Sequence, residues 1–204
     1  MQRDIVVRYA KRLVPDELAT GTAGNLSVRE SDVVAITPSG IAYELLTPGD
    51  VALVSLDGTL MQGRPSTELP LHLAVYRETA SAAVVHTHSP FATALGTVAD
   101  QLPAIHYLVA ELGGPVPVVP YATPGSDDLA QAATAALQGR SAVLLRNHGT
   151  LTVGDSLPRA YARAVLLEWL AALYYRARAF GEPSLLSEEE LARLAGLVTT
   201  YGRR

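Results

Sequence analysis

The chain has 204 residues and a formal net charge of −4 at pH 7, without a basic run that would favour nucleic-acid binding. Hydrophobic residues make up 49% of it and the mean hydropathy is +0.19, which suits one globular domain over residues 1–204 with a large buried core. No apolar run approaches a membrane span, and residues 1–13 carry charges throughout. We therefore expect a cytoplasmic protein with no membrane association and no signal peptide.

Two residue types narrow the chemistry further. The absence of cysteine excludes disulfides, thiolate catalysis and cysteine-based zinc sites. The only lysine, Lys11, lies in a charged N-terminal segment that reads as an amphipathic helix. A Schiff-base mechanism needs a desolvated lysine, so we do not expect one here.

The first third of the chain predicts one helix followed by short strands. Residues 3–13 place apolar side chains along one stripe of a helix. A Gly-rich turn then leads into a short strand, and Asp57-Gly58 is a strong hairpin signal. Further strands are expected over 32–37, 51–56 and 59–62.

The remaining chain mixes helices with strands. Helices are expected over 69–80, 90–98, 127–137 and 158–180, with a last one opening near residue 187. Ser126 and Ser187 are suited to be N-caps. Strands are expected over 82–88, 115–119 and 142–146, the last with a hairpin partner at 151–153. This order favours a helix-flanked sheet with antiparallel pairs over a doubly wound parallel sheet.

The expected strand 82–88 carries two histidines near its end. Side chains alternate along a strand, so His86 and His88 project from the same face. Pro90 follows soon after and cannot donate to a sheet ladder. Either histidine could be a packed core residue or a solvated one, but the pair at the end of a buried strand also suits a ligand site.

Glu68 and His148 extend this pair to a set of four. Each lies in its own polar junction flanked by Gly or Pro. Three imidazoles and one carboxylate suit a catalytic divalent transition metal, with zinc the leading candidate. His72 lies four residues after Glu68 and could pair with it on a helix. We instead expect His72 to be packed or beside a ligand, and His106 to be structural.

Three turns are rich in small hydrogen-bond donors. They are Thr22-Ala23-Gly24-Asn25, Thr37-Pro38-Ser39-Gly40 and Ser66-Thr67. Each alone is an ordinary turn, but together their N–H groups and hydroxyls could hold a phosphate without lysine. The Walker and GxGxxG patterns are absent, so a nucleotide is not indicated.

Eight segments together resemble the class II aldolase/adducin family, from about residue 21 to the C-terminus. They are GTAGNLSVR, ITPSG, RPSTELPLHLAVYR, VVHTHSP, AIHYLVAELGG, PYATPGSDDL, RNHGTLTVG and TYGRR. The resemblance implies an α/β fold with three layers, α/β/α, around a central mixed, largely antiparallel sheet. It also implies a homotetramer with active sites at the subunit interfaces.

The same resemblance assigns roles to individual residues. It implies zinc ligands at Glu68, His86, His88 and His148, with other divalent transition metals as alternatives. Phosphate-binding positions are implied at Asn25, Ser39, Gly40, Ser66 and Thr67, with Thr22 and Gly24 shaping the first loop. Glu68 is the implied base, Tyr107 a catalytic tyrosine donated across the interface, and Tyr201 a mobile C-terminal tyrosine that closes over the site.

The implied activity is reversible cleavage of a sugar phosphate. L-fuculose 1-phosphate, or a related ketose 1-phosphate, would give dihydroxyacetone phosphate and an aldehyde such as L-lactaldehyde, through an enediolate stabilised by the metal. Pro124 stands where the fuculose enzymes carry an aromatic residue, so the aldehyde preference is open. A pentulose-phosphate 4-epimerase, a sugar-phosphate dehydratase, a structural zinc site and a metal-free adducin-like interaction module are the alternatives.

Overall fold

A mixed sheet of nine strands runs through the part of the chain that the computed structural model describes, residues 2–198, with side chains described up to residue 194. The strands are β1 (Asn25–Glu30), β2 (Val33–Ile36), β3 (Ala52–Ser55), β4 (Leu60–Gln62), β5 (Ala83–Thr87), β6 (Gln101–Leu102), β7 (Val116–Val119), β8 (Ala142–Leu145) and β9 (Gly149–Gly154). Their spatial order is β4-β3-β2-β1-β5-β9-β8-β7-β6. Neighbouring strands are antiparallel except for β7 and β8, which are parallel.

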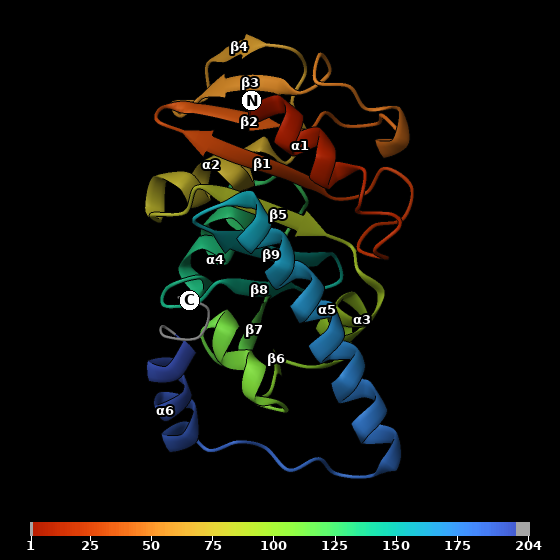
Figure 1. The fold of residues 1–204 in the computed structure, drawn as a ribbon, viewed down its shortest axis with the longest axis vertical. Coiled ribbons are helices and arrows are strands. Elements are labelled where there is room, and N and C mark those ends of the chain that lie inside the picture. The colour runs from red at the N-terminus through yellow and green to blue at the C-terminus, as the bar shows by residue number, and fades with distance from the viewer. Residues whose placement is uncertain (1, 199–204) are drawn as a thin grey trace.

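Helices cover both faces of this sheet (Figure 1). One face carries α1 (Gln2–Ala10), α3 (Pro90–Val98) and the long α5 (Leu157–Phe180), and the other carries α2 (Leu69–Glu78) and α4 (Asp127–Ala136). Two 3₁₀ helices, η1 (Tyr43–Leu45) and η2 (Tyr107–Leu112), and α6 (Glu188–Val198) complete the elements. The three-layer α/β/α architecture and the largely antiparallel sheet are thereby confirmed.

Strand β5 separates the two main cores by simple alternation. Ala83 and Val85 pack with α1 and α5 in one cluster, whereas Val84 packs with α2 and α4 in the other. Alternation then directs His86 to the side of α2. His86 and the start of α2 thus lie on the same face of the sheet.

Most elements agree with the sequence prediction, and the differences have local causes. The first helix was expected to run to residue 13 but ends at Ala10, where tighter i→i−3 bonds take over. Pro15 follows and disfavours a helical conformation in the residue before it. The helix expected over 69–80 ends at Glu78, because Thr79 is extended and its hydroxyl binds the Val75 carbonyl. The short strand β6 and both 3₁₀ helices were not predicted.

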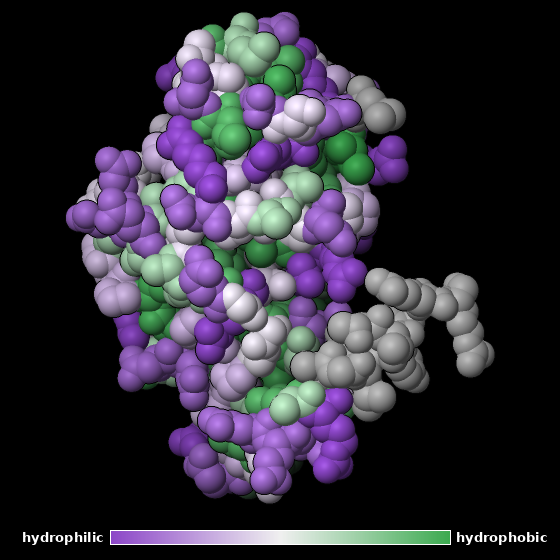
Figure 2. Space-filling model, turned by 90° about the vertical axis from the view of Figure 1, so that its left-hand side faces the viewer, coloured by the Kyte–Doolittle hydropathy of each residue, from purple (hydrophilic) through white to green (hydrophobic). Residues whose placement is uncertain are grey.

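On the side of the molecule shown in Figure 2, hydrophilic and hydrophobic residues alternate over short distances. The large aliphatic side chains of the sheet lie instead in the two layers between sheet and helices. Among the described residues, no helix combines the length and apolar character needed to cross a membrane.

Candidate metal centre and active site

Strand β5 supplies two of the clustered side chains. His86 is fully buried, pairs with Leu151 of β9, and donates from Nδ1 to the Thr150 carbonyl at 2.7 Å. His88 follows the strand, and its Nε2 lies 3.0 Å from Nε2 of His86. The sequence prediction that both imidazoles share one face is consistent with this contact.

The turn between β8 and β9 supplies the third imidazole. Leu145 pairs with Gly149, so residues 146–148 form the turn, and His148 N–H binds the Leu145 carbonyl at 3.1 Å. Asn147 adopts φ 54°, a left-handed conformation that asparagine tolerates better than most residues. The turn therefore presents His148 beside the end of β5.

Glu68 supplies the carboxylate from the residue that precedes α2. Its φ of −95° and ψ of 15° are not helical, and Pro70 follows in the first turn of the helix. The side chain is buried, with the residue only 8% exposed. Its Oε2 lies 3.1 Å from His86 Nε2 and accepts a 2.8 Å hydrogen bond from Asn25 Nδ2, while Oε1 lies 3.3 Å from His148 Nε2.

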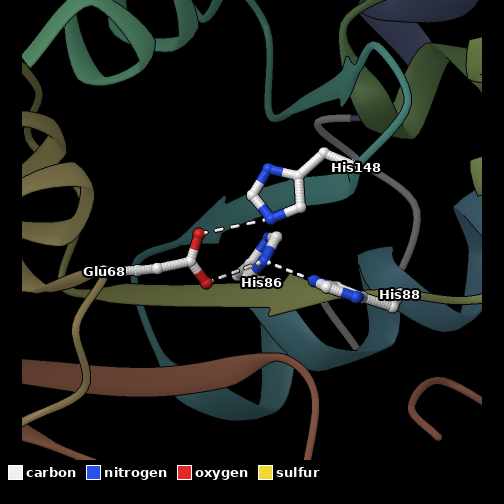
Figure 3. Close-up of side chains that lie close together, drawn as sticks. All are labelled: Glu68, His86, His88 and His148. Atoms are coloured by element: carbon white, nitrogen blue, oxygen red, sulfur yellow. Dashed lines mark hydrogen bonds and ion pairs between the residues drawn. The ribbon is translucent and has the colours of Figure 1, made fainter. Parts of the chain in front are cut away.

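The four side chains converge on one point (Figure 3). The ring centroids of His86, His88 and His148 are 4.9, 4.8 and 5.0 Å apart, which makes a nearly equilateral triangle. One ligand atom from each of these histidines and from Glu68 lies within 4.8 Å of the others. The four ligand positions implied by the sequence are thus brought together by three parts of the fold: the end of β5, the β8–β9 turn and the residue before α2.

The hydrogen bonds of His86 test whether a cation fits this centre. A carbonyl only accepts, so Nδ1 of His86 carries a proton, and in the neutral ring Nε2 then carries a lone pair. That lone pair faces a carboxylate oxygen and a second imidazole nitrogen at about 3 Å. Such a contact requires a proton or a metal ion between the atoms. The buried His148 Nδ1 also lacks a hydrogen-bond partner among the described residues, and Glu68 Oε1 has only the 3.3 Å contact with His148 Nε2.

The protonation states suit a metal centre as well. Burial alone would raise the pKa of Glu68, but its interactions with His148, His86 and Asn25 outweigh burial and hold that pKa well below its usual range. Burial, with His86 and His148 nearby, lowers the pKa of His88 to about 4. An ionised carboxylate and a neutral imidazole are the forms that bind metals.

Two glycines allow the backbone to approach the ligand strand. A Cβ at Gly149 would lie 2.3 Å from the Thr87 carbonyl oxygen and 3.0 Å from the His88 ring. Gly24 adopts φ +82°, and a Cβ there would lie 2.8 Å from the His86 carbonyl oxygen. Only glycine fits at these two positions without a shift of the neighbouring backbone.

The three donor-rich turns lie close to one another in the fold. Thr67 N–H binds Ser39 Oγ at 3.1 Å, and Ser66 N–H binds the carbonyl of Thr37 at 3.0 Å. The Ser66 hydroxyl accepts from Glu68 N–H. Asn25, at the start of β1, reaches the same place through its bond to Glu68. The predicted phosphate-binding segments therefore border the metal cluster.

Tyr43 is a supporting residue that sequence reasoning missed. Its hydroxyl donates to the carbonyls of Ala23 and Gly24, at 3.1 and 2.7 Å, and so braces the first donor-rich turn. Burial, with the Glu68 charge nearby, raises the pKa of Tyr43 and keeps the hydroxyl protonated. Nothing in its local sequence distinguishes it from an ordinary core tyrosine.

The remaining expected residues are placed differently. The predictions that His72 is packed and His106 structural fit the contacts: His72 lies outside the cluster and binds Asn25, and His106 caps η2 by accepting from Leu108 N–H. Burial lowers the pKa of His72 to about 3, so its ring is neutral. Tyr107 is 53% exposed and packs against the His106 ring. Tyr201 lies outside the described residues.

Comparison with known proteins identifies the family. Residues 4–175 match the model of the Class II Aldolase and Adducin N-terminal domain. The chain belongs to this family. It is 40% identical over 208 residues to 5-deoxy-D-ribulose 1-phosphate aldolase of Bacillus thuringiensis serovar kurstaki, covering 100% of this chain and 98% of that protein.

Two further relatives agree with this assignment. L-fuculose phosphate aldolase of Escherichia coli K12 is 40% identical over 191 residues, covering 92% of this chain and 89% of that protein. A solved structure of L-fuculose 1-phosphate aldolase superposes with a TM-score of 0.94 at 37% identity, covering 97% of this chain and 96% of the other. The predicted family and enzyme class, a class II aldolase and hence a lyase, are confirmed.

Proposed function

We propose that this class II aldolase reversibly cleaves a 1-phosphorylated deoxyketose into dihydroxyacetone phosphate and a short aldehyde. The observation that carries the proposal is the convergence of Glu68, His86, His88 and His148 beside three donor-rich turns. A metal-ligand set next to an anion-binding region fits a phosphorylated ketose better than either feature alone.

The four converging side chains would hold the divalent cation, with Zn²⁺ first because imidazole and carboxylate ligands suit it. When bound, such a cation supplies Lewis acidity that stabilises the negative charge left on the ketone fragment as the C–C bond breaks. This replaces the electron sink that a Schiff-base lysine would provide, in a chain whose only lysine is Lys11.

The protein's own groups would bind and orient the substrate. The phosphate would be held by Asn25, Ser39, Gly40, Ser66 and Thr67, with Thr22 and Gly24 shaping the first turn. Binding energy from the phosphate would be used to align the reacting carbons beside Glu68. These segments are joined by hydrogen bonds to one another and to Glu68, so the phosphate and the reacting end are held in a fixed relation.

Two groups would move protons. In the aldol direction, a Glu68 carboxylate oxygen would take a proton from the hydroxymethyl carbon of dihydroxyacetone phosphate. The phenol of Tyr107 from a neighbouring subunit would give a proton to the aldehyde oxygen, and would take it back from the hydroxyl during cleavage. Tyr201 would close over the site and exclude water.

The tyrosine assignment requires a homotetramer with active sites between subunits. Its support is the exposure of Tyr107, at 53%, on a surface available to a second copy. Light scattering would give the oligomeric state. Co-expression of Tyr107→Phe with Glu68→Gln would restore part of the activity that each variant lacks, because some sites would then combine two intact residues. Failure of the mixed oligomer to regain activity would contradict a shared site.

The substrate is narrowed by the two kinds of relative. L-fuculose 1-phosphate yields L-lactaldehyde and 5-deoxy-D-ribulose 1-phosphate yields acetaldehyde, so the two substrates differ at the aldehyde end. Pro124 lies in the turn before Gly125, where a Cβ would be 3.0 Å from the Thr67 carbonyl oxygen. The turn thus lies beside the donor-rich turn at Thr67, which supports a role of Pro124 in aldehyde choice.

A coupled assay for dihydroxyacetone phosphate tests the proposal. Both ketose 1-phosphates are supplied to the metal-loaded protein, with and without a chelator, and the products are identified. We expect chelator-sensitive release, and the ratio of kcat/KM values would give the preferred substrate. Release from neither compound by a protein with bound metal would overturn the proposal. An epimer or a dehydrated ketone among the products would identify an epimerase or a dehydratase instead, and a protein that retains no metal would fit the adducin-like module.

A further inference from the structure

A line of buried, hydrogen-bonded polar side chains runs between helix α2 and strand β1 and ends at Glu68. The Tyr76 hydroxyl lies 2.6 Å from Ser27 Oγ, and Ser27 Oγ lies 2.7 Å from His72 Nδ1. His72 Nε2 lies 2.5 Å from Asn25 Oδ1, and Asn25 Nδ2 donates to Glu68 Oε2 at 2.8 Å. We call Tyr76, Ser27, His72 and Asn25 the polar chain. Its members are at most 4% exposed.

The polar chain alternates between helix α2 and strand β1 because their spacings match. Glu68, His72 and Tyr76 are four residues apart, a rise of about 6 Å along a helix. Asn25 and Ser27 are two residues apart, which is about 6.6 Å along a strand. Both segments place these residues on the face toward the other. Asn25 and Ser27 of β1 therefore each fall between two polar groups of the α2 segment.

The bond directions follow from the two ends. An ionised carboxylate only accepts, so Asn25 turns Nδ2 toward Glu68 and Oδ1 toward His72. His72 Nε2 must then carry the proton, and its Nδ1 accepts from the Ser27 hydroxyl. Ser27 in turn accepts from the Tyr76 hydroxyl. Every donor in the polar chain points toward Glu68.

We propose that the polar chain positions the Glu68 carboxylate, with His72 as a positioning residue in the Nε2–H tautomer. The Asn25 amide is held from both ends, so its side chain serves Glu68 in addition to any contact with a phosphate. The bond fixes Oε2 and leaves Oε1 facing Nε2 of His148 at 3.3 Å. The carboxylate thus meets the metal centre in one orientation. The inference rests on the proposed metal centre and not on the identity of the substrate.

The tautomer is the most direct test. Long-range ¹H–¹⁵N spectra of the full-length protein, with and without Zn²⁺, resolve the two nitrogens of each of its five histidines. Comparison with His72→Gln assigns the His72 signals. We expect a protonated Nε2 and an unprotonated Nδ1 in both samples. A proton on Nδ1 would reverse the bond to Ser27 and overturn the proposal.

Variants test whether the polar chain acts on the metal centre. Outer hydrogen-bond partners of metal ligands contribute about 10–100-fold to metal affinity or activity. His72→Leu removes the donor to Asn25, and we expect Zn²⁺ affinity, measured by competition with a chromogenic chelator, to fall by about tenfold or more. In His72→Gln the side-chain amide can donate to the same oxygen, so affinity should recover in large part. Equal affinities for folded wild type and His72→Leu would overturn the proposal.

Milder variants guard against misfolding. Ser27→Ala keeps His72 but removes its donor at Nδ1, so the His72 ring should lose its single tautomer. Tyr76→Phe removes only the far hydroxyl, and we expect a smaller loss of Zn²⁺ affinity. Tyr161→Phe is the matched control, because it removes a tyrosine hydroxyl that binds Asp16 on the other side of the sheet. Equal effects of the two tyrosine variants on Zn²⁺ affinity would point to general destabilisation and contradict the proposal.

Positioning and aldolase activity can be separated by these measurements. If the tautomer and the graded Zn²⁺ affinities are found but no ketose 1-phosphate is cleaved, the proposed function fails and the positioning role is supported. If cleavage is found while His72→Leu binds Zn²⁺ normally, the positioning role fails alone.

Discussion

Helices α2 and α5 pack on opposite faces of the same sheet, yet they place different groups in its interior. The buried residues of α5 are aliphatic or alanine except for Tyr161. Helix α2 buries His72 and Tyr76 among leucine and valine, and it begins directly after Glu68. Burying polar groups costs free energy unless they are hydrogen-bonded, and on α2 each of them is.

The difference indicates that α5 contributes mainly to the stability of the fold and α2 mainly to the metal centre. Helix α5 stabilises the sheet by apolar packing along 24 residues. Two of its polar side chains make structural hydrogen bonds: Glu168 accepts from the first turn of α3, and Tyr161 donates to Asp16 in the turn after α1. Helix α2 is only 10 residues long, and its polar face is directed toward the metal centre. Substitutions on α2 should therefore change activity more than stability, and those on α5 the reverse.

Glu68→Gln should have the largest effect. Glutamine keeps the size of the side chain but cannot act as a base, so turnover should fall by about 10²–10⁴-fold. Some metal should be retained by the three histidines. Dihydroxyacetone phosphate release and metal content measure the two effects, and Glu78→Gln, at the exposed far end of α2, is the control. Near-normal turnover by a metal-loaded Glu68→Gln protein would remove Glu68 as the base.

Leu167→Ala tests the other helix. Leu167 is fully buried on α5, and its truncation should lower the free energy of unfolding by about 2–5 kcal/mol. Chemical denaturation measures this loss, and kcat of the folded, metal-loaded enzyme should stay close to wild type. A large fall in kcat with unchanged stability would show that α5 contributes to chemistry directly.

Glu168→Gln probes the contact of α5 with α3. The Glu168 carboxylate accepts from Phe91 N–H and Ala92 N–H, both at 2.8 Å, and so caps a helix whose N-cap Ser89 makes no side-chain bond of that kind. Glutamine offers one acceptor oxygen instead of two, so the expected loss is about 1–3 kcal/mol of unfolding free energy. Faster hydrogen exchange at these two amides, relative to those of α4, would identify the lost cap.

Tyr161→Phe should have the smallest effect. It removes the 2.9 Å hydrogen bond to Asp16, worth about 0.5–1.5 kcal/mol, and leaves Zn²⁺ affinity unchanged. Thermal denaturation and the chelator competition measure the two quantities. A loss of Zn²⁺ affinity here would mean that the two faces of the sheet are coupled.

The sequence predicts what is local or periodic. The period-2 pair His86 and His88, the N-cap bonds of Ser126 and Ser187, and the hairpin of β8 with β9 follow from neighbours along the chain. The ligand set was predictable because imidazoles and a carboxylate in polar junctions are unusual in an apolar chain.

Contacts between distant segments could not be predicted in the same way. Ser27 and Tyr76 are 49 residues apart in the sequence. Glu168 accepts from the N–H groups of Phe91 and Ala92, which are 77 and 76 residues away from it. One signal was available, because Glu68, His72 and Tyr76 recur every four residues and the positions between them are apolar. That pattern indicates a polar face toward the sheet, but it does not give the strand that meets it.

The matched spacing of α2 and β1 also limits how the chain can change in length. One residue inserted between Glu68 and Tyr76 would turn the helix by about 100° and separate all the later partners at once. One residue inserted between Asn25 and Ser27 would move one of them to the opposite face. The turn between β3 and β4, residues 56–59, takes no part in these contacts or in the donor-rich turns. Natural insertions and deletions should therefore accumulate in the β3–β4 hairpin. The segments from Asn25 to Ser27 and from Glu68 to Tyr76 should keep their length.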